Sequence, residues 1–227
     1  MTNIHKYVKG IPKLQGNSFY KCPSCLAGKI SKRSITFQSP EKSLINTMQT
    51  KIDSTMHIGQ HWSMDFGFMR GSAYKRKSQS GHTITSIDGY NSYLLTIERK
   101  TRFIWVFLSA SKTPPVDIVK TLLNKFKSNH PHRTVRTDQG GELGKSSLFK
   151  TMIQQTGFHL ELTGSDASAQ NGLAENPNKS LAQMVRCMLF SAELGPEYCS
   201  FCLIHAVYIK NCIIHFDLSI KVKDNQQ

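Results

Sequence analysis

The chain has 227 residues, of which 29 are Lys or Arg and 15 are Asp or Glu, so its formal net charge is +14. A hydrophobic content of 39% with 15 Gly and 8 Pro is ordinary for a globular domain and excludes a collagenous or wholly disordered chain. No stretch approaches the roughly 18 consecutive apolar residues of a membrane helix, and the N-terminus has no apolar signal core, so we expect an intracellular protein that crosses no membrane.

The positive charge is unevenly distributed. Residues 1–60 carry a net charge of +7, residues 61–150 carry +9 and residues 151–227 carry −2. Lys and Arg side chains neutralise phosphates and release condensed counterions, so the excess predicts a nucleic-acid partner for the first two-thirds of the chain. A generically basic surface is the alternative that charge alone leaves open.

The first 60 residues hold one sharp feature, the pair Cys22-x-x-Cys25, followed by a polar stretch without periodicity. Two cysteines at this spacing are half of a zinc site, which needs four ligands. We therefore predict an incomplete zinc-knuckle segment at 1–36 and a linker at 37–58. The main domain follows at 59–215, and a polar tail at 216–227.

Beyond residue 60, strand-like and helix-like segments alternate. Segments rich in β-branched and aromatic residues are predicted strands, at 61–68, 92–98, 102–108, 134–138 and 159–163. Segments with helical periodicity or boundary signals are predicted helices, at 116–126, 146–155, 173–194 and 197–214. A hairpin first, then alternating strands and helices, then helices, predict an α/β fold in which helices cover both faces of a mixed five-stranded sheet.

Three acids lie at strand ends or at the start of a helix, where sheets of this kind commonly carry their functional residues. Asp65 and Asp138 stand near the ends of predicted strands, and Glu175 stands in the first turns of a predicted helix. Carboxylates that converge there would suit Mg²⁺, and a pair of such ions can drive phosphodiester displacement. Taken singly, each acid is more often a solvated surface charge than a metal ligand. Other acids are interpreted as turn or surface residues, namely Asp88, Glu98, Glu142 and Asp166.

The motifs around the three acids are WSMDFG at 62–67, TDQGGEL at 137–143 and QNGLAENPN at 170–178. With these motifs the chain resembles the integrase core of copia-type long-terminal-repeat retrotransposons, from about Cys22 to about His215. The gap between Asp138 and Glu175 is one residue longer than the family commonly has. The separation of Asp65 and Asp138 exceeds that of retroviral relatives, and a basic loop at 70–81 accounts for part of it.

The resemblance implies a ribonuclease-H-like fold and a DDE-type polynucleotidyl transferase. Asp65, Asp138 and Glu175 would be catalytic and would hold two Mg²⁺ or Mn²⁺ ions. The implied reaction is the processing of element cDNA ends and the attack of their 3′ hydroxyls on target DNA. The implied partners are these DNAs and further copies of the chain, and the implied location of an active protein is the nucleus.

Several side chains are candidates for DNA contact. Lys179 and Arg186 share a helix face with Glu175, although a Glu to Lys surface pair would explain Lys179 as well. The other candidates are Lys75, Arg76 and Lys77 in the basic loop, Arg99, Lys100 and Arg102 around the hairpin turn, and Gln170 and Asn171 before the third acid. Isolated charge runs of this kind are otherwise solvated faces.

The six cysteines are expected to stay reduced in a chain without a secretion signal. The resembling family supplies two His before its Cys pair, whereas only His5 precedes Cys22 and Cys25 here. We therefore expect no stable zinc knuckle, because the other ligands lie outside this chain or Met1 is an internal start. Cys199 and Cys202 fall in a predicted helix and are interpreted as core cysteines.

Two functional hypotheses follow. The first is the catalytic core of a retrotransposon integrase, with all three acids present. The second is a decayed or repurposed remnant that folds and binds nucleic acid through its basic half without catalysis. The altered C-terminal part and the incomplete zinc ligands favour the second.

Overall fold

The computed structural model describes residues 22–29, 56–69, 83–111, 113–138, 142–163 and 172–212, with the side chains of residues 172–176 left out. In chain order its elements are α1 (Pro23–Lys29), β1 (His61–Phe68), β2 (Ser92–Glu98), β3 (Ile104–Ser109), α3 (Val116–Phe126), β4 (Thr134–Asp138), α4 (Glu142–Lys145), α5 (Ser147–Gln155), β5 (His159–Thr163), α6 (Gly172–Ser191), a 3₁₀ turn η2 (Pro196–Tyr198) and α7 (Cys199–Cys212).

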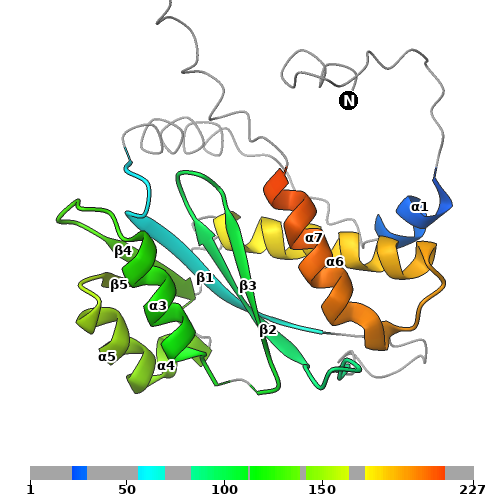
Figure 1. Ribbon diagram of the computed structural model, residues 1–227, viewed down its shortest axis with the longest axis horizontal. Coiled ribbons are helices and arrows are strands. Elements are labelled where there is room, and N and C mark those ends of the chain that lie inside the picture. Colours follow the sequence, from blue (N-terminus) through cyan, green and yellow to red (C-terminus); the bar gives the residue numbers. More distant parts are fainter. Residues whose placement is uncertain are drawn as a thin grey trace, which may run out of the picture.

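The strands form one sheet in the order β3-β2-β1-β4-β5. Strands β1, β2 and β3 pair antiparallel, whereas β4 and β5 run parallel to β1. In Figure 1 helices α3, α4 and α5 lie on one side of this sheet, and α6 and α7 lie on the other. This mixed five-stranded sheet with helices on both faces is a ribonuclease-H-like arrangement, which confirms the predicted fold class.

Two separate cores follow from the alternation of side chains along the strands. Trp62 and Met64 point to one face of β1 and pack with α3 and α5 through Leu123 and Phe149. The opposite face of the sheet packs α6 and α7 against a second core. All seven residues of β2 are buried, because this strand has neighbours on both edges and helices over both faces.

Most elements lie where the sequence predicts them. Strands β1, β2, β4 and β5 and helix α3 have the predicted bounds, and Ser146 caps α5 by accepting the Phe149 N–H. The prediction missed α1 and α4, which have seven and four residues and are too short to show a helical period.

Glu98 is the clear error among the acids that the sequence set aside as turn or surface residues. It is 2% exposed. Its carboxylate accepts the Gly59 N–H at 3.1 Å and both the N–H and the hydroxyl of Thr101, at 2.6 and 2.7 Å. These bonds allow the charge to be buried, because each oxygen that leaves water gains a protein donor.

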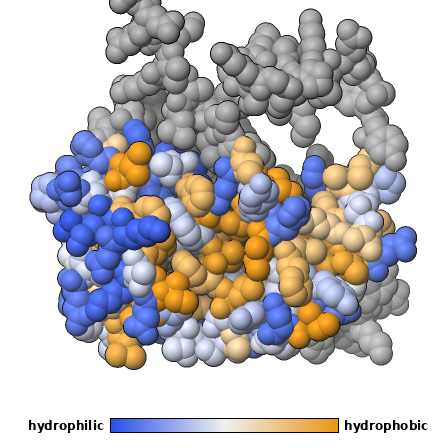
Figure 2. All heavy atoms as spheres, in the orientation of Figure 1, coloured by the Kyte–Doolittle hydropathy of each residue, from blue (hydrophilic) through white to orange (hydrophobic). Residues whose placement is uncertain are grey.

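The face seen in Figure 2 is apolar in the middle, where β3 lies between α3 and α7. A groove of about 460 Å³ is lined there by Trp105 and Phe107 of β3 and by Ile118, Leu122 and Phe126 of α3. No helix within the described parts of the chain is long and apolar enough to cross a bilayer.

Candidate active site

The register of two neighbouring parallel strands places Asp65 and Asp138 on the same face of the sheet. The paired residues of β1 and β4 include Trp62 with Val135 and Ser63 with Arg136. Asp65 and Asp138 each stand two residues further along, so the register gives them facing positions on the same face of the sheet. That face is the one covered by α6, because the cross-strand partner of Asp65 is Leu95 of the second core.

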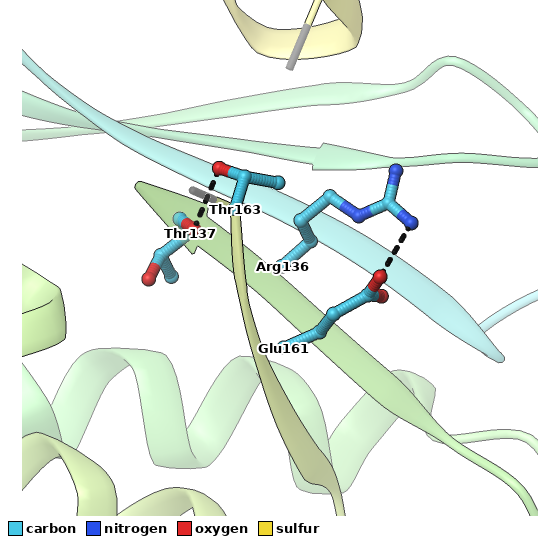
Figure 3. Close-up of polar contacts among 4 residues, drawn as sticks. All are labelled: Arg136, Thr137, Glu161 and Thr163. Atoms are coloured by element: carbon cyan, nitrogen blue, oxygen red, sulfur yellow. Dashed lines mark hydrogen bonds and ion pairs between the residues drawn. The ribbon is translucent and has the colours of Figure 1, made fainter. Parts of the chain in front are cut away.

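Asp138 is the exposed last residue of β4, and its neighbour on β5 is Thr163. Side-chain contacts tie the two strands together beside it, as Figure 3 shows. The Thr163 hydroxyl donates to the Thr137 carbonyl at 3.1 Å, and Arg136 meets Glu161 at 2.8 Å. The polypeptide that presents Asp138 is therefore anchored on the β5 side, up to the point where the strand ends.

Asp65 is half-buried and is bound by a side chain of α6. The Asn178 amide donates to Asp65 Oδ2 at 2.9 Å, and the Tyr93 hydroxyl donates to Asn178 Oδ1 at 2.7 Å. Burial raises the pKa of Tyr93 to about 12, and the negative charge of Asp65 adds to this shift. The phenol is therefore protonated at any physiological pH and is available as a donor.

Glu175 lies in α6, one turn before Asn178. Positions three apart share a helix face, so the backbone places Glu175 on the face of α6 that meets β1 through Asn178. Pro177 stands between them inside the helix. It cannot donate to the carbonyl of residue 173, so the turns that carry Glu175 lack one helical hydrogen bond.

Asp65, Asp138 and Glu175 have the donor chemistry that Mg²⁺ or Mn²⁺ requires, since all three would offer carboxylate oxygens from adjoining elements. The β1–β4 register puts the two strand acids on one face of the sheet, and Asp65 Oδ2 already accepts a hydrogen bond from the Asn178 side-chain amide there. The donor set therefore fits such an ion. Among the side chains that the structure describes, no three His, Cys, Asp or Glu gather closely enough to hold a metal.

The predicted DNA-contact residues are distributed over several parts of the molecule. Lys179 is exposed on α6, one turn beyond Glu175. Arg186 is also exposed, but its Nε donates to the Gly28 carbonyl of α1 at 3.1 Å. Five of the other candidates lie outside the described residues, namely Lys75, Arg76, Lys77, Gln170 and Asn171.

The cations of the hairpin turn lie away from the acids. The Arg99 N–H donates to the carbonyl of His61, so the turn adjoins the start of β1, four residues or about 13 Å along the strand from Asp65. Arg99 is 8% exposed, and Lys100 and Arg102 are half-buried. The burial of Arg99 limits its access to a phosphate, whereas Lys100 and Arg102 retain more exposed surface.

The Cys22 and Cys25 thiols lie at the start of α1 and interact with each other. Hydrogen bonds from the Cys25 backbone and thiol lower the pKa of Cys22, and the bond to Cys22 raises the pKa of Cys25. Within the described ranges no third ligand completes a metal site around them, and His5 lies outside these ranges. The described residues therefore do not fit a zinc knuckle.

Helix α1 instead packs on α6. A Cβ at Gly28 would overlap the side chain and backbone of Cys187, so only glycine permits this close approach. Of the other cysteines, Cys199 is 7% exposed in the second core, as predicted, and Cys202 is half-buried.

Sequence reasoning missed Tyr93 and Asn178. Asn178 stands three residues after Glu175, and this helical spacing could have identified it. Tyr93 gave no comparable signal, because an aromatic residue inside a strand is usually a core residue.

Comparisons with known proteins find similarity to retrovirus-related Pol polyproteins. The chain is 26% identical over 132 residues to the retrovirus-related Pol polyprotein from transposon RE2 of Arabidopsis thaliana, covering 56% of this chain. It is 28% identical over 130 residues to the Pol polyprotein from transposon TNT 1-94 of Nicotiana tabacum, covering 54% of the chain. With the polyprotein from transposon RE1 of Arabidopsis thaliana the match is 22% over 194 residues, or 85% of the chain.

The matched regions make up 9%, 9% and 13% of those three polyproteins, so the chain corresponds to a small part of each. No protein-family model matches the chain. The fold and these matches together establish a ribonuclease-H-like protein with distant similarity to retrotransposon Pol polyproteins.

Proposed function

We propose that the chain is the catalytic core of a retrotransposon integrase, which cuts element cDNA ends and joins them to target DNA. The observation that carries this proposal is the convergence of three acid-bearing elements. The register of β1 and β4 gives Asp65 and Asp138 facing positions, and the Asn178 to Asp65 bond brings the turn of Glu175 to the same place. The distant similarity to Pol polyproteins supports the same assignment.

In this function Asp65, Asp138 and Glu175 would hold two Mg²⁺ or Mn²⁺ ions. Such a pair, when bound, activates the attacking hydroxyl and stabilises the leaving oxygen of a phosphodiester. The protein's own part is to hold three carboxylates at one point, where without cations they would repel one another. Work on chromosomal DNA would place an active protein in the nucleus.

Among the cations that the structure describes, Lys179 is the best candidate to hold the DNA strand. It is exposed and lies one helical turn beyond Glu175, so an ammonium there can contact a phosphate next to the reacting one. The charge of +9 over residues 61–150 supplies further attraction for the duplex. Lys100 and Arg102 at the hairpin turn would contact DNA some distance from the acids.

The test is a strand-transfer assay with the full chain, a labelled model DNA end and a target plasmid, in Mg²⁺ or Mn²⁺. The proposal expects a joined product that requires the divalent ion and disappears in Asp65→Asn. The matched control is Asp117→Asn, which changes an exposed acid at the start of α3 on the other side of the sheet and should keep the activity.

A folded chain that binds DNA but forms no ion-dependent product would contradict the proposal. That outcome would favour the non-catalytic remnant, in which the basic surface persists without the reaction. Equal product from wild type and Asp65→Asn would also contradict it, because the joining would then come from another source.

A further inference from the structure

A buried tyrosine is linked to the first candidate acid by a chain of two hydrogen bonds. The Tyr93 hydroxyl donates to Asn178 Oδ1, and Asn178 Nδ2 donates to Asp65 Oδ2. The three residues belong to β2, α6 and β1, so the chain joins two strands and the helix that covers them. Tyr93 itself is 7% exposed.

The backbone is adapted to the position of the tyrosine ring. Gly67 is the cross-strand partner of Tyr93 on β1, and it stands two residues beyond Asp65 on the same face. A Cβ at Gly67 would overlap the Tyr93 ring and its hydroxyl. A glycine at this position therefore lets the ring lie across β1 and reach α6.

The direction of the two hydrogen bonds is fixed by chemistry. An ionised carboxylate only accepts, so Asn178 must turn its NH₂ group to Asp65 and its oxygen to Tyr93. That oxygen then needs a donor, which the phenol supplies. Each bond defines the orientation of the next, and the flexible Asn178 amide is held in one of its two orientations.

We propose that Tyr93 is a positioning residue, which acts through Asn178 to fix the carboxylate of Asp65 and the approach of α6 to β1. This inference rests on the function proposed above, in which Asp65 holds a metal ion. Because Glu175 lies one turn before Asn178, the same bonds hold the part of α6 that carries Glu175 against β1. Groups that orient a metal ligand from behind contribute substantially to metal affinity.

The experiment measures Mn²⁺ binding to the full chain by electron paramagnetic resonance, which needs neither DNA nor turnover. Tyr93→Phe keeps the ring and removes only the hydroxyl. We expect it to weaken Mn²⁺ binding by about 10-fold, the lower end of the effect of such supporting residues. Tyr90→Phe is the matched control, because Tyr90 packs on the same core outside the hydrogen-bond chain, and it should bind Mn²⁺ like wild type.

A double variant separates positioning from packing. If Tyr93 acts through Asn178, then Tyr93→Phe should weaken Mn²⁺ binding no further once Asn178→Ala has been introduced. Two independent, multiplying losses would overturn the proposal. Asn178→Ala alone must also weaken binding, and since it places a strong helix former in α6 it tests the chain of bonds even if Tyr93→Phe folds poorly.

Mn²⁺ binding distinguishes a failure of the proposed function from a failure of the role of Tyr93. Wild type that binds no Mn²⁺ would overturn the proposed function and this inference with it. Wild type that binds Mn²⁺ while Tyr93→Phe binds equally well would overturn the role of Tyr93 alone.

Discussion

Two carboxylates, Glu98 of β2 and Asp65 of β1, lie in different regions of the paired strands and have different surroundings. At the hairpin end, formed by Gly59, His61, Glu98 and Thr101, the Glu98 carboxylate is 2% exposed and accepts three hydrogen bonds. At the acid edge, formed by Asp65, Asp138 and the start of α6, Asp65 is half-buried and Asp138 is exposed.

The donors to these two carboxylates explain the difference. Glu98 is bound by backbone N–H groups and a neighbouring hydroxyl, which hold the turns before β1 and after β2. Asp65 is bound by the side chain of Asn178, which comes from another element and is itself oriented by Tyr93. A carboxylate bound mainly by backbone N–H groups of adjoining turns stabilises the fold, whereas one that a side chain orients near the surface can serve a ligand.

The strongest test of this contrast is Asp138→Asn. The acid edge should lose ion-dependent DNA joining by about 1000-fold, equivalent to about 4 kcal/mol in activation free energy, because one carboxylate of the proposed metal set is gone. The free energy of unfolding should change little, since Asp138 is exposed at the end of β4. The strand-transfer assay and urea denaturation measure the two quantities. A variant with full activity would remove Asp138 from the site.

Glu98→Gln should have the opposite profile. The amide NH₂ would face either the Gly59 N–H or the two donors of Thr101, so we expect a loss of about 2 to 3 kcal/mol in the free energy of unfolding. Urea midpoints measure this loss, with exposed Glu193→Gln as the control. DNA joining per folded molecule should be unchanged, and a catalytic defect without a stability loss would break the contrast between the two regions.

Pro177→Ala should raise the free energy of unfolding by stabilising the first turns of α6. The new N–H can donate to the carbonyl of residue 173, and we expect a gain of about 1 kcal/mol in the free energy of unfolding. This is less than the roughly 3 kcal/mol of a proline deep inside a helix, because only the first turns of α6 precede position 177. Slower amide hydrogen exchange in these turns would support the gain of this hydrogen bond, and unchanged exchange would contradict it.

The smallest effect is a pH dependence at the hairpin end. Burial lowers the pKa of His61 below its usual 6.5, and the charge of Arg99 adds to the shift. The unfolded chain then binds more protons at this position than the folded one, so stability falls as the pH drops below 6.5. His61→Gln should flatten this loss between pH 6.5 and about 5, where an unperturbed His titrates.

Thermal midpoints across this pH range test the prediction for His61. His205→Gln, which changes an exposed His of α7, is the matched control and should keep the wild-type slope. Arg99, Arg136 and His130 add to the lowering of the His61 pKa and Glu161 opposes it, and all of these contributions are lost with the His61 side chain. An unaltered slope in His61→Gln would place the acid-sensitive group elsewhere.

The sequence by itself determined most of the elements and the fold class. Runs of β-branched and aromatic residues predicted β1, β2, β4 and β5, and helical periodicity predicted α3. The motifs also singled out Asp65, Asp138 and Glu175 as site candidates. The short helices α1 and α4 were not predicted, because a helix of one or two turns shows no period.

The tertiary structure decided what each polar side chain does. Glu98 and Asp65 look alike as strand acids, and only strand pairing and neighbouring turns make one a buried structural group and the other a partner of α6. Arg99 lies beside the start of β1 and away from Asp65, because β2 runs antiparallel to β1 and its end adjoins the start of β1. Hydrogen bonds and burial join residues far apart in the chain, such as Tyr93 and Asn178, and no local pattern encodes those distances.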